Sequence, residues 1–271
     1  MDGSNMRKIN IKKLNFILMQ FINTMYILLV VCLLFNQCKA HIFMKDPPSR
    51  HNKYSQHYTN NNLVNYNLNS PLNVSPDYFK FPCKGFSTGP PTTTFNGNTI
   101  SISLEGTATH GGGHCQFGIS YDNKEFVVLK TVLDTCLLDS MTYSFNLPEN
   151  AMGGNMIVFW SWINRIGNRE YYMECADVNV NNGNTQPTSI TGKELLVVNL
   201  PGYKTVGEWN QGDSSSKTGK NLILQMKSKT LLVKVSQSSK VSQTTQKSTT
   251  QNRSFRLRKQ RRRRRRKQRI N

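Results

Sequence analysis

Residues 99–180 consist of short segments in which apolar and polar side chains alternate, with turn-forming residues between them. A period of two residues is typical of a β-strand with one buried face, and no stretch of this region has the longer period of an amphipathic helix. Consecutive strands joined by turns favour two packed antiparallel sheets. We therefore predict an all-β fold, an antiparallel β-sandwich with long loops. The segments expected to form its strands are TISISLEG, HCQFGISYDN, EFVVLKTVL, MTYSFNLPENA, NMIVFWSWINRIGN and EYYMECADVNV.

The segment IVFWSW indicates which side chains belong in the core. Alternation along a strand places Val158, Trp160 and Trp162 on one face, with Phe159 and Ser161 on the other. Large aromatic side chains are mostly buried in folded proteins, so we expect Trp160 and Trp162 to pack in the core.

Residues 1–40 have the composition of a secretory signal peptide. A basic stretch, MRKINIKKLN, precedes the apolar run YILLVVCLLF and then Ala40, a small residue suited to cleavage. The alternative is a membrane anchor, but the uninterrupted apolar run is shorter than the roughly 20 residues that a spanning helix needs. We expect cleavage after Ala40, which gives a secreted, extracellular protein that begins at His41 and has no membrane segment.

Four of the six cysteines follow the predicted cleavage site. An even number of cysteines in a secreted chain predicts two disulfides, and four cysteines allow three pairings among which their spacing does not choose. These cysteines are Cys83, Cys115, Cys136 and Cys175.

The net charge of +20 is concentrated near the C-terminus. Residues 211–271 contain 19 of the 35 Lys and Arg residues, whereas residues 41–210 are nearly neutral. The Ser-, Thr-, Gln- and Lys-rich composition of residues 211–271 predicts a tail that is disordered, apart from the brief apolar pieces NLILQM and LLVKV, after a folded domain that spans residues 41–210. The arginine run in this tail suits acidic polysaccharides, and the alternative is a solvated, self-repelling tail without a binding function. We expect no nucleic-acid binding, because the chain has a predicted signal peptide and paired cysteines.

His41 would offer a metal two nitrogen ligands as the N-terminal residue, its α-amine and its imidazole. One further imidazole completes a flat set of three nitrogens, which suits Cu²⁺. The segment GTATHGGGHCQF supplies two candidates, and its three glycines make a helix very unfavourable. His110, beside the glycine-rich loop, is the expected ligand, whereas His114 begins the next strand and is expected to have a structural role.

Together with His41, several segments resemble the chitin-active, fungal-type lytic polysaccharide monooxygenases of auxiliary activity family 11. The resemblance extends over essentially all of residues 41–203, and the block WINRIGNREYYMECA is its specific part. It implies an immunoglobulin-like or fibronectin-III-like sandwich with copper on a flat face. The matching segments are DYFKFPCKG, EGTATHGGGHCQFGISYDN, FWSWINRIGNREYYMECADVNV and GKELLVVNLPGY.

By motif position, the resemblance implies that His41 and His110 form a histidine brace around the copper ion. It implies further that Tyr172 is the axial tyrosine, that Glu170 acts on the oxygen co-substrate, and that Ala108 shapes the pocket beside the metal. Alternation places Glu170 and Tyr172 on one side of their strand, so they can act at one site. The disulfide pairing that the resemblance implies is Cys83–Cys175 and Cys115–Cys136.

The activity that the resemblance implies is oxidative cleavage of glycosidic bonds in crystalline chitin. It would need one copper ion, an external reductant, and H₂O₂ or O₂ as co-substrate. The partner would be an insoluble polysaccharide, and the protein is expected to act as a monomer. The alternatives are the same chemistry on cellulose or another glucan, and a non-catalytic secreted protein that binds copper or polysaccharide.

Three residues depart from the common pattern of the family. Tyr171 and Glu174 stand where Met and Asn are common, and His114 stands where Ser is common. The added histidine is close to the metal loop in sequence, where it could compete for copper or tune it.

Overall fold

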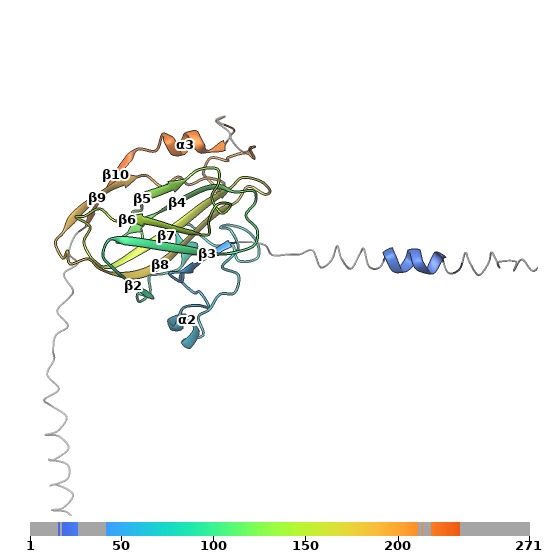
Figure 1. Cartoon of the computed structure of the whole chain (residues 1–271), viewed down its shortest axis with the longest axis horizontal. Coiled ribbons are helices and arrows are strands. Elements are labelled where there is room, and N and C mark those ends of the chain that lie inside the picture. Colours follow the sequence, from blue (N-terminus) through green and yellow to red (C-terminus); the bar gives the residue numbers. More distant parts are fainter. Residues whose placement is uncertain (1–15, 17, 27–41, 211–212, 214–217, 234–271) are drawn as a thin grey trace, which may run out of the picture. The chain divides into compact units, whose positions relative to one another are not determined.

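The computed structural model describes residues 16, 18–26, 42–210, 213 and 218–233 (Figure 1). The predicted signal peptide falls mostly outside these residues, and the arginine-rich run falls wholly outside them. Residues 18–26 are helical. None of the helices in the described part of the chain is long and apolar enough to cross a membrane.

The fold consists of two β-sheets. A three-stranded sheet has the order β1-β3-β6, and a seven-stranded sheet has the order β10-β9-β5-β4-β7-β8-β2. Neighbouring strands are antiparallel except β2, which pairs in parallel with β8. The predicted all-β sandwich is confirmed, with this one parallel pair as a difference. The strands are β1 (Ile42–Asp46), β2 (Thr93–Asn96), β3 (Thr99–Gly106), β4 (Gly113–Ser120), β5 (Val127–Val132), β6 (Thr142–Asn146), β7 (Gly154–Asn164), β8 (Tyr171–Asn181), β9 (Thr188–Lys193) and β10 (Ser228–Val233).

Short helices occur in the segments outside the sheets. A long segment joins β1 to β2, and it contains two short helices. The last helix precedes β10. These helices are α2 (Gln56–Asn60), the 3₁₀ helix η1 (Cys83–Gly85) and α3 (Lys220–Leu224).

Alternation along β7 divides its side chains between two apolar cores, as predicted. Val158, Trp160 and Trp162 lie in the core between the two sheets, and Phe159 lies in a second core on the opposite face of the seven-stranded sheet. The second core is covered by residues from outside the strands. They include Leu72, Phe79, Leu196, Val198, Val206, Trp209 and Ile223.

The fold continues beyond residue 210, where we predicted its end. β10 pairs with β9 over its whole length, and Leu231 and Val233 are buried in the core between the sheets. The predicted boundary is therefore corrected, and the described fold reaches residue 233. The polar composition around this segment predicted disorder, but the alternating apolar side chains of β10 provide enough burial for one more strand.

The structure contains two disulfides with the pairing that the resemblance implies. Cys83 of η1 is joined to Cys175 of β8, and Cys115 of β4 is joined to Cys136 in the loop after β5. The first disulfide ties the long segment between β1 and β2 to the seven-stranded sheet. A cross-link between residues 92 positions apart limits the freedom of the unfolded chain.

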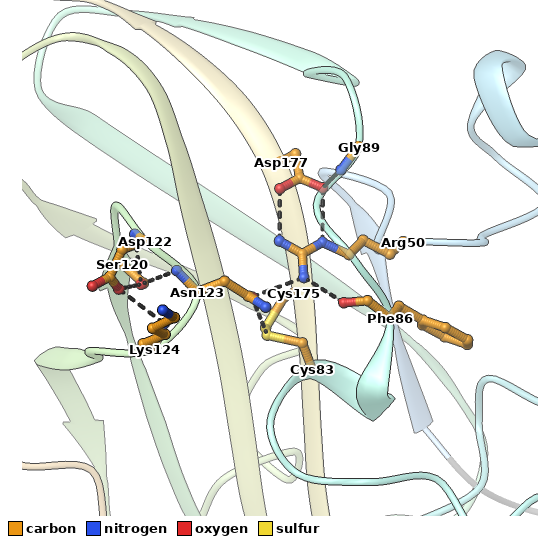
Figure 2. Close-up of a disulfide and its surroundings, with 10 residues drawn as sticks. All are labelled: Arg50, Cys83, Phe86, Gly89, Ser120, Asp122, Asn123, Lys124, Cys175 and Asp177. Atoms are coloured by element: carbon orange, nitrogen blue, oxygen red, sulfur yellow. Dashed lines mark hydrogen bonds and ion pairs between the residues drawn. A yellow bond between two sulfur atoms is a disulfide. The ribbon is translucent and has the colours of Figure 1, made fainter. Parts of the chain in front are cut away.

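Arg50 attaches the same segment to β8 by a buried ion pair (Figure 2). Its Nε and Nη2 each donate to one carboxylate oxygen of Asp177, both at 2.7 Å. Its Nη1 donates to the Phe86 carbonyl and to Asn123 Oδ1. The backbone N–H of Gly89 donates to the same carboxylate at 2.9 Å, so Asp177 holds two distant parts of the segment against β8.

Replacing Arg50 by Met should destabilise the fold strongly, because it leaves the Asp177 charge buried without its partner. The Arg50 side chain is 1% exposed and that of Asp177 8% exposed. We expect the free energy of unfolding in urea to fall by about 3–5 kcal/mol. The exposed Lys45–Glu105 pair provides the control, since Lys45→Met should leave the urea midpoint almost unchanged. Equal losses in the two variants would show that Arg50 is not an anchor.

Candidate metal centre

His110 lies in the turn between β3 and β4, and three glycines follow it. All four residues have positive φ, from 45° at His110 to 139° at Gly113, a region that glycine enters without strain. A Cβ atom on Gly112 would lie 2.5 Å from the Asp134 carbonyl oxygen, and one on Gly113 would lie 2.1 Å from the Ile163 carbonyl oxygen. The glycines therefore let the turn lie directly against two neighbouring backbones, and no helix forms here.

The loop between β7 and β8 holds this turn in place. The backbone N–H of Ile166 donates to the His110 carbonyl, and that of Arg165 donates to the Gly112 carbonyl, both at 3.1 Å. Two loops far apart in sequence are thereby joined at one end of the seven-stranded sheet.

His110, Glu170 and Tyr172 meet at this end of the sheet. The Tyr172 hydroxyl donates to Glu170 Oε2 at 2.8 Å, and His110 Nε2 lies 3.9 Å from the same oxygen. The His110 side chain is 23% exposed and that of Glu170 only 6% exposed, so the imidazole is the more accessible group. Burial, reinforced by the charge of Glu170, raises the pKa of Tyr172. The phenol therefore stays protonated and acts as the donor.

Trp162 packs against the rings of His110 and Tyr172. Its ring centroid lies 5.6 Å from that of His110 and 4.6 Å from that of Tyr172, and its Nε1 donates to the Gly112 carbonyl at 3.3 Å. The predicted core position of Trp162 is confirmed. The structure adds that this core residue also supports the candidate site.

Asn164 is a site residue that the sequence did not point out. Its Oδ1 accepts from the Glu170 backbone N–H at 3.2 Å, and its Nδ2 donates to the carbonyls of Ile166 and Asn168 at 3.0 and 2.7 Å. This buried amide closes the β7–β8 loop and fixes the backbone of Glu170. The only signal in the sequence was a polar residue at the end of an apolar strand, directly before a loop with Gly167.

His41 lies outside the described residues. Ile42 pairs with Gly106 at the end of β3, four residues before His110, so β1 begins at the same end of the sandwich. Ala108 lies in the turn before His110 and is partly exposed. Among the residues that the structure describes, no three His, Cys, Asp or Glu side chains are grouped to hold a metal ion.

His114 has a structural role, as we expected from its place at the start of a strand. It is buried, its Nδ1 accepts the Asp134 backbone N–H at 3.0 Å, and its Nε2 lies 2.8 Å from the Thr218 carbonyl. Since Nδ1 accepts, the ring proton is on Nε2 and donates to Thr218. The ring also stacks on Trp209, with centroids 4.6 Å apart. Both nitrogens are thus engaged, Nδ1 with the loop after β5 and Nε2 with the segment before α3.

Three curated relatives are similar to the chain. One is named an AA11 family lytic polysaccharide monooxygenase A from Aspergillus fumigatus, 41% identical over 144 residues, with 51% of this chain and 64% of the relative covered. Another is named an AA11 family lytic polysaccharide monooxygenase from Aspergillus oryzae, 31% identical over 160 residues, with 51% of this chain and 35% of the relative covered. The chain thus spans less than two thirds of the length of these relatives. No protein-family model matches.

Solved structures give a weaker likeness. One is described as Bacillus amyloliquefaciens CBM33 in complex with Cu(I) after photoreduction, with 14% identity, a TM-score of 0.37, and coverage of 52% of this chain and 99% of the other. A second is described as an AA10 lytic polysaccharide monooxygenase from Streptomyces lividans, with 15% identity, a TM-score of 0.35, and coverage of 51% and 99%. The curated relatives confirm the resemblance of the chain to auxiliary activity family 11.

The His114 network should make stability depend on pH. Burial lowers the pKa of His114 below its ordinary value of 6.5. Below about pH 6.5 the unfolded chain therefore binds a proton more readily than the folded protein, so the stabilisation is complete above that pH and is lost as the pH falls. We expect the free energy of unfolding in urea to decrease more steeply for the wild type than for His114→Gln between about pH 6.5 and pH 5. Parallel pH curves for the two proteins would contradict this assignment.

Proposed function

We propose that the protein is a secreted, copper-dependent lytic polysaccharide monooxygenase that cleaves glycosidic bonds in crystalline chitin by oxidation. The observation that carries the proposal is the contact of Tyr172 with Glu170 beside the His110 imidazole. These are residues to which the family resemblance assigns the site, and His110 is far in the sequence from Glu170 and Tyr172, which are two residues apart. The similarity to the curated Aspergillus relatives supports the same activity.

The described donors fit a copper ion by their chemistry. The imidazole of His110 offers nitrogen, and the Tyr172 hydroxyl and Glu170 carboxylate offer oxygen close to it. Divalent copper favours nitrogen ligands and also accepts oxygen, so these residues could hold the ion. In the proposal, His41 adds its α-amine and imidazole and completes the three nitrogens. The ion would accept an electron from an external reductant and activate H₂O₂ or O₂.

Glu170 and Tyr172 have different tasks in the proposed reaction. Tyr172 keeps its proton and donates a hydrogen bond to Glu170 Oε2. The other carboxylate oxygen, Oε1, would then hold a proton or deliver it to the co-substrate. Asn164 keeps the Glu170 backbone in register, and Trp162 excludes water from the inner side of the site. The His110 side chain is partly exposed, and in this proposal substrate would approach the site from there. A surface site of this kind suits an insoluble polymer, which cannot enter a cleft.

The parts of the chain on either side of the sandwich would have roles of their own. Residues 1–40 would be removed as a signal peptide, and the sandwich would begin at His41 and act outside the cell as a monomer. Most of the basic residues of the proposed tail follow residue 233. They would bind acidic polysaccharide and keep the enzyme close to its substrate. We propose chitin as the substrate because the family that the chain resembles acts on chitin, and cellulose or another glucan is the alternative.

Oxidised oligosaccharides are the direct test of the activity. Mature protein with copper and ascorbate should release oxidised chitin fragments detectable by mass spectrometry, and a parallel incubation with cellulose identifies the substrate. His110→Ala should release none, because one of three proposed nitrogen ligands is lost. Lys45→Met, with its exposed side chain, should match the wild type. Copper binding without oxidised products from either polymer would establish the non-catalytic alternative instead.

Copper affinity tests the proposed N-terminal ligand. A single Gly placed before His41 moves the free amine away from the imidazole and removes one chelating nitrogen. We expect a large loss of Cu²⁺ affinity in calorimetric titration against the protein that begins at His41. His57→Ala, a change of a histidine on α2, should leave the affinity unchanged. Equal affinity with and without the added Gly would rule out the proposed brace.

A further inference from the structure

Two charged side chains that the proposed chemistry does not use are fully buried. Glu174 extends from β8, and Lys84 reaches it from η1, with Nζ 3.7 Å from Oε1 and each side chain 1% exposed. Each residue is next in sequence to a cysteine of the Cys83–Cys175 disulfide. Lys84 Nζ also donates to the Ser70 carbonyl. The pair therefore joins β8 to two parts of the long segment between β1 and β2.

The second oxygen of Glu174 binds β1. Glu174 Oε2 accepts the backbone N–H of Met44 at 2.9 Å, and the Met44 carbonyl accepts from Asn52 Nδ2 at 2.8 Å. The backbone N–H and carbonyl of Met44 thus form hydrogen bonds on the side of β1 that faces away from β3, the strand with which β1 pairs. Because β1 and β8 belong to different sheets, the carboxylate of Glu174 connects the two layers of the sandwich.

The β1–β3 pairing is irregular at the same point. Ile42, Phe43 and Met44 pair in register with Gly106, Glu105 and Leu104, but the register shifts between Met44 and Asp46. The hydrogen bonds to β3 alone therefore hold β1 over only a few regularly paired residues. Glu174 supplies an additional attachment at the last of these pairs, which fixes how β1 lies along the sandwich.

Glu174 also belongs to the strand that carries the candidate site. Tyr172 and Glu174 are two residues apart on one face of β8, a separation of about 7 Å along the strand. On β1, Ile42 is two residues before Met44 and lies at the end of the sandwich where His110 is found. One attachment at Met44 thus fixes the position of Ile42 relative to Tyr172 and His110.

Stability alone does not explain the pair. Burial raises the pKa of Glu174 and lowers that of Lys84 to about 8, so burying both charges is costly. Replacement of a buried ion pair by apolar side chains of similar volume is often neutral or stabilising. An apolar side chain would, however, provide no acceptor for the Met44 N–H. The carboxylate of Glu174 therefore contributes by fixing the position of β1.

We propose that Glu174, which pairs with Lys84, is a positioning residue that fixes the start of β1 at Ile42 relative to His110 and Tyr172 and thereby shapes the copper site. This inference rests on the proposed function for its link to copper. The attachment of β1 by Glu174 has its own measurement, the exchange of the Met44 amide hydrogen.

Two double variants distinguish the effect of losing the hydrogen-bond acceptor for Met44 from the effect of losing the buried charges. Lys84→Met with Glu174→Gln removes both charges and keeps an oxygen that accepts the Met44 N–H, whereas Lys84→Met with Glu174→Met removes the acceptor as well. Both should fold, because no buried charge is left alone. With Glu174→Met, the Met44 amide should exchange faster, the Cu²⁺ affinity should fall about tenfold or more, and the paramagnetic resonance spectrum of Cu²⁺ should change. With Glu174→Gln, all three should stay close to the wild type.

The inference is overturned if the two double variants agree in Met44 exchange, copper affinity and spectrum. If the Glu174→Met protein does not fold, Glu174→Gln alone decides, since it keeps the acceptor while leaving Lys84 without a carboxylate. It should lose stability but keep the copper spectrum, and an altered spectrum with a protected Met44 amide would overturn the inference. A wild-type protein that does not bind copper would overturn the proposed function, and Met44 exchange would still show whether Glu174 fixes β1.

Discussion

The attachment of the long segment between β1 and β2 to three closely spaced residues of β8 is the constraint on which the rest of the structure depends. Glu174 forms an ion pair with Lys84. Cys175 forms a disulfide with Cys83, and Asp177 binds Arg50 in a bidentate pair (Figure 2). The same strand carries Tyr172, with Glu170 just before it. Because anchor and candidate site share β8, the segment that enters from β1 is held in a fixed relation to the site.

Features that depend on short-range geometry could be predicted from the sequence. The alternation in β7 correctly divides Trp160 and Phe159 between two cores, because neighbouring side chains of a strand must point to opposite faces. The glycines after His110 correctly exclude a helix, because all three adopt positive φ. The end of the fold could not be placed this way. The polar residues around β10 outweigh its few apolar side chains in composition, and only pairing with β9 makes it a strand.

Long-range contacts account for what the sequence could not show. Arg50 and Asp177 are 127 positions apart, and His114 finds the Thr218 carbonyl 104 positions away. Nothing in the local sequence distinguishes Lys84, which is buried, from an exposed lysine such as Lys45. At the candidate site, His110, Glu170 and Tyr172 could be named from motifs. The contribution of Asn164 could not, because it consists of hydrogen bonds to a loop whose path the sequence does not reveal.

The long separation in sequence between the anchored segment and β8 also determines the order in which parts of the protein can fold. Contacts between distant parts of a chain form late, because a long loop must close before they are made. Residues 42–90 are synthesised early, yet Arg50 and Lys84 gain their partners only when residues 174–177 have emerged. Until then the first strand has no fixed place across the sandwich. The N-terminal edge, although made first, is therefore among the last parts to reach its final geometry, and a metal ion that needs this edge would bind a protein that has already folded.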